Sequence, residues 1–67
     1  MAVARVTEIS STSTTSFEDA IKSGLERANA TLRNVKSAWI KEQHVRLDEG
    51  TITKYQVNML VTFVLDD

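Results

Sequence analysis

The side chains able to bind a ligand or react are few in this chain of 67 residues. Trp39, the one tryptophan, offers a flat surface for stacking on a planar ligand. Gln56 carries an amide that can both donate and accept hydrogen bonds at the edge of a ring. The one histidine, His44, would need a nucleophile and an orienting group to act as a base. Its charged neighbours, Glu42 and Arg46, are explained as well by a salt-bridge network, so we expect binding and no enzyme.

The composition excludes several other kinds of site. There is no cysteine, which excludes disulfides and thiolate metal sites, and one histidine cannot form a histidine-rich cluster. Eight basic and nine acidic residues give a net charge of −1 without a basic block, so we expect no nucleic-acid partner. The pairs Asp48–Glu49 and Asp66–Asp67 could bind calcium or magnesium between subunits. A solvated turn and a solvated tail explain them more simply, so we predict no metal ligand.

The length and hydropathy predict a small protein that associates with itself. No apolar run is long enough to span a bilayer, and residues 1–4 lack the basic start and apolar stretch of a secretory signal. We therefore expect a soluble, cytoplasmic protein without a membrane partner. A single domain over 1–67 would bury only about 60% of its unfolded surface as a monomer. We expect a homo-oligomer to supply the missing stability.

The first half of the chain predicts a strand, a loop and a helix. Residues Ala2–Ile9 are rich in β-branched side chains, which favour a strand. The run of small hydroxyl residues Ser10–Ser16 favours a connecting loop. A helical stripe of apolar residues over Phe17–Asn34 follows, and Thr15 with Glu18 predicts a capping box at its start.

The second half predicts a β-hairpin. Strands are expected over Lys36–Leu47 and Thr51–Leu65, joined by a type I turn in which Gly50 adopts positive φ. In the last strand every second residue is apolar, whereas the face that carries Gln56 is mixed. Within Lys36–Leu47, strict alternation places Ala38 and Ile40 on one side of the strand. The side chains on the other side are Ser37, Trp39, Lys41 and Gln43.

These elements give an α+β fold of order β-α-β-β, with one helix packed on a three-stranded antiparallel sheet. The last strand would be about 50 Å long, whereas the helix would cover only about 27 Å. One helix therefore cannot shield the whole apolar face. We expect the end that carries Phe63 and Leu65 to bury against another subunit.

In element order, spacing and total length the chain resembles the dodecins, small β-α-β-β proteins that form hollow dodecamers and sequester flavins. The resemblance covers nearly the whole sequence and rests on Glu8–Ile21, Glu26–Val35, Tyr55–Val57 and Val61–Asp67. It implies a dodecin-like homo-oligomer, a dodecamer, that stores a small planar ligand between subunits. The implied cofactor is a flavin, riboflavin or flavin mononucleotide.

The resemblance also implies site residues. In typical flavin-binding members a tryptophan near the start of the second strand stacks on the isoalloxazine ring. Aligned without gaps, that position is Ser37 here, and Trp39 lies about 6.6 Å further along the same side of the strand. We therefore expect a divergent member that lacks the usual tryptophan position and in which Trp39 takes over the stacking.

Two more positions carry over from the resemblance. Gln56 matches the family glutamine that hydrogen-bonds the flavin ring. The arginines that some members use for ligand phosphates fall on His44 and Val64 here, and Arg46 could substitute in part.

Other interpretations of the site stay open. Trp39 could pack against a neighbouring subunit, and Gln56 could make an ordinary interface hydrogen bond. The chain would then be a structural or ion-binding oligomeric shell that has lost flavin binding. The departures at Ser37, His44 and Val64 are the evidence for this alternative.

Overall fold

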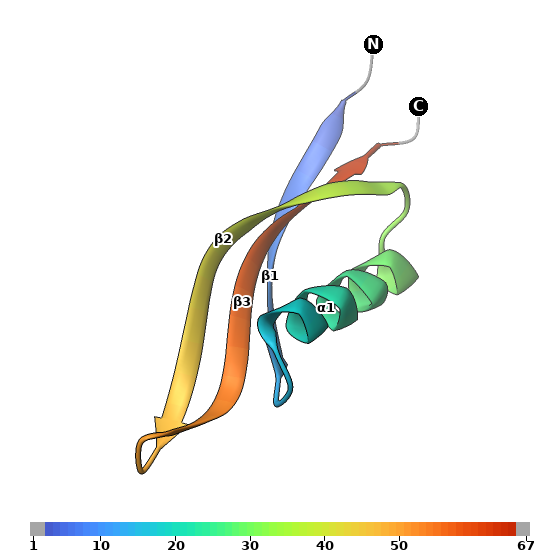
Figure 1. Ribbon diagram of the computed structural model, residues 1–67. Coiled ribbons are helices and arrows are strands. Elements are labelled where there is room, and N and C mark those ends of the chain that lie inside the picture. The colour runs from blue at the N-terminus through green and yellow to red at the C-terminus, as the bar shows by residue number, and fades with distance from the viewer. Residues whose placement is uncertain (1–2, 66–67) are drawn as a thin grey trace.

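The computed structural model describes residues 3–65. The central strand of its sheet is the last one in the chain, so that the sheet order is β1-β3-β2, and all pairs are antiparallel. The helix lies on one side of this sheet (Figure 1). The predicted β-α-β-β fold is confirmed. Its elements are β1 (Ala4–Ser13), α1 (Phe17–Thr31), β2 (Val35–Asp48) and β3 (Thr51–Val64).

The core forms where small residues of α1 meet the apolar face of β3. Val57, Met59 and Val61 alternate along β3 and are fully buried, as is Ala20 of α1. Such alternation points every second side chain of a strand to the same face. At the start of the helix the rings of Phe17 and Tyr55 meet edge to face, with their centroids 5.1 Å apart.

Gly24 lets α1 approach the sheet closely. A Cβ atom at this position would lie 2.7 Å from Cε of Met59 and 2.9 Å from Cβ of Ser11. Both distances are too short for carbon atoms. The Met59 methyl group ends a flexible side chain and can move, but Ser11 Cβ is held by the strand, so a larger residue would push the helix away from β1. The glycine therefore explains why the helix and the sheet pack tightly with so few large side chains.

The hydroxyl-rich segment differs from the prediction of a loop. Ser10, Ser11, Thr12 and Ser13 belong to β1 and pair with Asn58, Val57, Gln56 and Tyr55 of β3. Backbone pairing with an existing strand overrides the weak local preference of serine for turns. The connection to α1 is therefore only three residues long, 14–16.

The helix begins where the pattern predicts, but a different residue caps it. Ser16, not Thr15, is the N-cap, and its hydroxyl accepts a hydrogen bond from the Asp19 backbone N–H at 3.0 Å. The helix ends at Thr31, before the predicted Asn34, because the chain turns there to enter β2. Asn34 adopts positive φ, 58°, a conformation that asparagine tolerates better than most residues.

The β2–β3 turn is tighter than predicted. Asp48 and Thr51 pair directly, which leaves Glu49 and Gly50 as the two loop residues. Both have positive φ, 49° and 80°, as a type I′ turn requires. The predicted type I turn is wrong, because a two-residue loop must match the right-handed twist of its strands.

A β-bulge in β2 changes which side chains share a face. The pairing with β3 shifts between Ile40 and Glu42, which leaves Lys41 as the extra residue. Strict alternation therefore fails beyond this point. Gln43 pairs with the buried Val57, so it lies on the helix side and not beside Trp39 as predicted.

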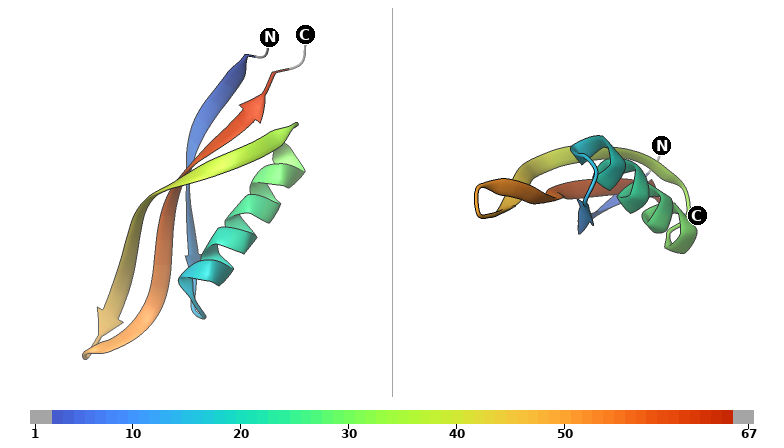
Figure 2. Two further views of the ribbon diagram at one scale, coloured as in Figure 1. Left: turned by 45° about the horizontal axis from the view of Figure 1, so that its top comes forward. Right: turned by 60° about the horizontal axis from the view of Figure 1, so that its bottom comes forward.

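The sheet extends well beyond the helix. The longest dimension of the subunit is 51 Å, whereas the 15 residues of α1 cover only about 22 Å. The β2–β3 hairpin projects past both α1 and β1 (Figure 2), with Leu47 60% exposed and Ile52 45% exposed. At the other end Leu65 is 43% exposed and Phe63 is half-buried. The uncovered apolar surface therefore lies at both ends of the sheet, not only at the predicted one.

Candidate functional site

The side of the sheet opposite α1 carries the predicted binding residues, and we call it the open face. Along β3 it is formed by the residues that alternate with the buried ones, and residues that pair directly across strands share a face. The α1 helix covers only the other side, so these side chains have no second layer above them (Figure 2). On β3 the open face comprises Gln56, Asn58, Leu60 and Thr62.

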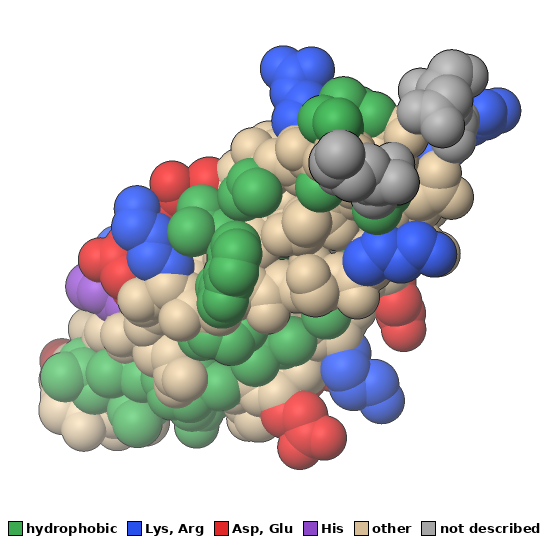
Figure 3. Space-filling view, turned by 90° about the horizontal axis from the view of Figure 1, so that it is seen from above, with side chains coloured by type: hydrophobic (Ala, Val, Ile, Leu, Met, Phe, Trp, Pro, Cys, Tyr) green, Lys and Arg blue, Asp and Glu red, His purple; other side chains and the backbone are tan. Residues whose placement is uncertain are grey.

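Trp39 is the largest exposed side chain on the open face. It lies in β2 opposite Leu60, and 63% of its surface is exposed. Ser37, two residues earlier, is exposed opposite Thr62. Hydrophobic side chains gather in a band across the surface of the molecule, with acidic and basic side chains at its margins (Figure 3). A ring of this size in water is a surface that a planar ligand or another subunit can cover.

Gln56 and Arg46 share the open face with Trp39 but lie further along the sheet. Gln56 pairs with His44, whereas Trp39 pairs with Leu60. Gln56 precedes Leu60 by four residues, so it lies about 13 Å from Trp39 along the strand direction. Arg46 pairs with Lys54 near the turn, two residues beyond His44. The structure therefore puts all four predicted residues on one face, with Ser37 beside Trp39 and the other two progressively more distant.

The bulge at Lys41 is what aligns these residues. Trp39 is an odd-numbered residue, whereas His44 and Arg46 are even-numbered, so a regular strand would turn them to opposite faces. The extra residue reverses the alternation, so that Trp39 before the bulge and both His44 and Arg46 after it lie on the open face.

A hydrogen-bonded network that the sequence did not reveal crosses the three strands here. The Gln56 amide nitrogen donates to Ser10 Oγ at 2.9 Å and to Asn58 Oδ1 at 3.4 Å. Asn58 Nδ2 in turn donates to Glu42 Oε1 at 3.0 Å. The two-residue spacing of Gln56 and Asn58 predicts that they share one face of β3, so these two members of the network could have been found from the sequence. Ser10 and Glu42 could not be found without the strand register and the bulge.

An ion pair lies beside this network. The Lys41 ammonium is 3.3 Å from a carboxylate oxygen of Glu8, so the bulged residue links β2 to β1 across the central strand. Both side chains are 47% exposed, and such an exposed pair contributes little to stability. Its structural effect is to direct the Lys41 side chain to the open face.

One buried hydroxyl on the open face has no partner. Thr62 Oγ1 is buried between Val6 and Ser37 and finds no hydrogen bond among residues 3–65. An unpaired buried hydroxyl costs about 1–3 kcal/mol.

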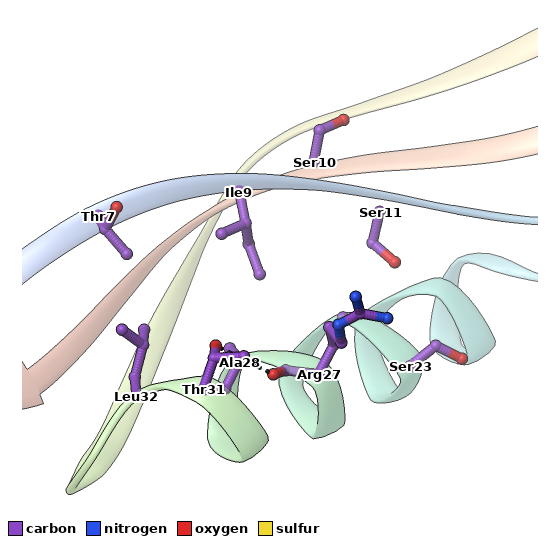
Figure 4. A pocket seen from close by; sticks show the side chains of 10 residues that line it. Thr7, Ile9, Ser10, Ser11, Ser23, Arg27, Ala28, Thr31 and Leu32 are labelled. Carbon is purple, nitrogen blue, oxygen red and sulfur yellow. Dashed lines mark hydrogen bonds between the residues drawn. The ribbon is translucent and has the colours of Figure 1, made fainter.

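A separate cavity of about 520 Å³ lies between α1 and the edge strand β1. Its lining includes Ile9, Ala28 and Leu32, and Arg27 reaches from α1 toward Ser11 of β1 (Figure 4). None of the predicted site residues lines it, although Ser10 of the open-face network does.

Titratable groups do not gather into a metal centre in the described chain. Within residues 3–65, no three His, Cys, Asp or Glu side chains come together as ion ligands. The carboxylates of Asp66 and Asp67 lie outside the described residues. No helix of residues 3–65 is long and apolar enough to cross a membrane.

The fold and the open face define a class: a small β-α-β-β subunit whose sheet presents an exposed tryptophan and a polar network on its uncovered side. A sequence model of the Dodecin family matches residues 3–66, so the chain belongs to the dodecin family. This family consists of small oligomeric ligand-binding proteins that are known as non-enzymatic. A search of curated proteins gives no match.

Solved structures support the assignment. The chain is 38% identical to the dodecin from Streptomyces davaonensis, with a TM-score of 0.94, covering 98% of this chain and 97% of that one. It is 33% identical to a mutant of the dodecin from Thermus thermophilus, with a TM-score of 0.94 and full coverage of both chains. It is 31% identical to the calcium dodecin from Mycobacterium tuberculosis, with a TM-score of 0.82, covering 96% of this chain and 91% of that one.

The expected divergence at the tryptophan is not borne out. The match extends through β2, and this strand carries a tryptophan exposed on the open face. An alignment without gaps assumes that all members have the same number of residues between equivalent positions. Bulges and hairpins of different length break this assumption. The position of Trp39 is therefore no evidence that a stacking site has been lost.

Proposed function

We propose that this protein is a homo-oligomeric storage protein that sequesters a planar ligand, a flavin, between its subunits. The observation that carries the proposal is the exposure of Trp39 on an uncovered sheet face that also presents the Gln56 amide. In this proposal the ligand ring stacks on Trp39, and Gln56 binds the edge of the ring. Storage requires no catalytic group, so the ligand is held and released unchanged.

The geometry favours a site shared by two copies. A tryptophan can remove on the order of 200 Å² from water, and one strand can cover only one face of a stacked ligand. A second copy, related by symmetry, would supply another tryptophan for the other face. The separation of about 13 Å between the levels of Trp39 and Gln56 also exceeds what a single small group can bridge.

Ser37 and Arg46 have secondary roles in this proposal. Ser37 lies beside Trp39 and leaves space next to the stacked ring. Arg46 lies near the turn and could pair with a ligand phosphate, which would favour flavin mononucleotide over riboflavin. The assembly into a dodecamer is proposed from the family resemblance.

A fluorescence titration of riboflavin with ligand-free protein tests the function. Because stacking on an indole ring quenches flavin emission, we expect saturable quenching at micromolar protein. Trp39→Ala should weaken binding on the order of tenfold or more, since it removes the stacking surface. Trp39→Phe, which keeps an aromatic ring, is the matched control and should retain most of the affinity.

The absence of quenching would favour the alternative of an ion-binding or structural shell. A specific observation supports that candidate, namely the similarity to the calcium dodecin from Mycobacterium tuberculosis. Within residues 3–65 of one copy no three ion ligands come together, so an ion site would draw further ligands from outside these residues or from other copies. A melting temperature that rises with added calcium would identify it.

A further inference from the structure

The hydrogen bonds of Gln56 determine what its amide can offer to a ligand. An amide nitrogen carries two hydrogens and accepts none, whereas the amide oxygen only accepts. Both hydrogens of Gln56 Nε2 have acceptors within the chain, Ser10 Oγ at 2.9 Å and Asn58 Oδ1 at 3.4 Å. Only Oε1 is therefore left for a bound molecule.

The orientation of this amide is set two side chains away, by Glu42. A carboxylate is an acceptor only, so the Asn58 atom 3.0 Å from Glu42 Oε1 must be the amide nitrogen. Asn58 Oδ1 then faces Gln56, where it can receive only an N–H group. The charge on Glu42 thus fixes the Asn58 amide, and Asn58 Oδ1 fixes the Gln56 amide, whose second hydrogen the Ser10 hydroxyl accepts.

We propose that Ser10, Asn58 and Glu42 are positioning residues that make Gln56 an obligate acceptor. The site then selects planar rings that carry an N–H donor on their edge, such as the imide N–H of a flavin. This inference rests on the proposed function in one respect, that Gln56 contacts the edge of the ligand ring.

Burial strengthens this selection. In a single subunit the network is partly exposed, and water competes for its hydrogen bonds. A ligand and a second copy that cover the open face would exclude this water, and a hydrogen bond in a drier site is electrostatically stronger. A ring without the N–H would then leave Oε1 buried and unpaired, which is costly.

Two flavins that differ only at the imide nitrogen test the selection. Lumiflavin carries the N–H, and 3-methyllumiflavin carries a methyl group in its place. We expect the wild-type protein to bind lumiflavin at least about tenfold more tightly, as measured by quenching. In Glu42→Gln and Asn58→Leu the Gln56 amide can turn and donate to a ring carbonyl, so the preference should fall towards equal affinity.

A matched control separates the network from general changes to the open face. Lys41→Gln removes the neighbouring ion pair with Glu8 and leaves the network intact, so the preference should be unchanged. Equal affinity of the wild-type protein for both flavins would overturn the inference. An unchanged preference in the folded Asn58→Leu variant would do the same.

A measurement without ligand distinguishes failure of the network from failure of the proposed function. If neither flavin is quenched, the proposed storage function fails. Hydrogen exchange of the Gln56 side-chain amide, measured by NMR, then tests whether the network holds this amide in place. We expect both hydrogens to exchange more slowly in the ligand-free wild-type protein than in Asn58→Leu. Equal exchange rates would show that the network does not hold the amide.

Discussion

At the scale of single residues, one extra residue in β2 decides the composition of the open face. Lys41 occupies the bulge, and beyond it the alternation of β2 is reversed. Without that reversal, Glu42 and His44 would lie on the helix side, away from Trp39. The ion pair of Lys41 with Glu8 also directs the bulged side chain across the sheet. The site therefore depends on a local irregularity and not only on the residue types that bind.

Thr62 allows a test at the same scale. Because its buried hydroxyl has no partner among residues 3–65, Thr62→Val should leave stability equal or raise it by about 1–2 kcal/mol. Thr53→Val is the matched control, since the Thr53 hydroxyl donates to the Arg46 carbonyl at 3.3 Å, and it should be neutral or slightly destabilising. Denaturant midpoints measure both. A clear loss in Thr62→Val would mean that the assembly or a ligand provides a partner for this hydroxyl.

At the scale of elements, the junction between β1 and α1 depends on Ser13. This buried hydroxyl accepts from the Thr15 N–H at 2.9 Å and from the Ser16 N–H at 3.4 Å, and it donates to Asp19 Oδ2 at 2.7 Å. It thereby closes the three-residue connection and orients Asp19 at the positive end of the helix dipole. The end of the strand and the start of the helix are joined through one side chain.

Ser13→Ala should therefore destabilise the protein by about 1–2 kcal/mol, because backbone donors lose their acceptor in a half-buried turn. Thr14→Ala, at the exposed neighbouring position, should change stability by less than about 0.5 kcal/mol. Thermal or denaturant unfolding compares the two. Equal effects would show that water replaces Ser13 without cost.

At the scale of the whole molecule, the subunit has more apolar surface than its helix can cover. Few side chains within residues 3–65 are fully buried, whereas Trp39, Leu47 and Ile52 remain substantially exposed. A chain of this length buries little surface alone, so burial between copies adds to its stability. The projecting hairpin and the open face are the surfaces available for contacts between copies (Figure 2).

Leu47→Asp should break the assembly and leave the subunit folded. Leu47 is 60% exposed in one chain, so a charge there is tolerated in the subunit, but an unpaired charge buried at an interface is not. Light scattering should show smaller particles, with the far-UV circular dichroism retained. Leu65→Asp tests the other end of the sheet in the same way. Asn29→Asp, the same charge change on the exposed side of α1, should leave the assembly intact, and an intact Leu47→Asp oligomer would contradict the hairpin contact.

The sequence by itself determined the order and type of the elements and the family. Apolar residues at helical spacing after Phe17 and alternating residues in β3 are local patterns, and they survive in the structure because burial follows them directly. The same alternation separated Gln56 from the buried face of β3.

Only the tertiary structure decided which side chains meet. The extension of β1 through Ser13, the I′ turn at Glu49–Gly50 and the bulge at Lys41 all depend on pairing between strands that are distant in sequence. The network that fixes Gln56 exists because this register brings Ser10, Asn58 and Glu42 to one face. Periodicity within one strand cannot predict an extra residue in it, because the energy that stabilises a bulge comes from the partner strand.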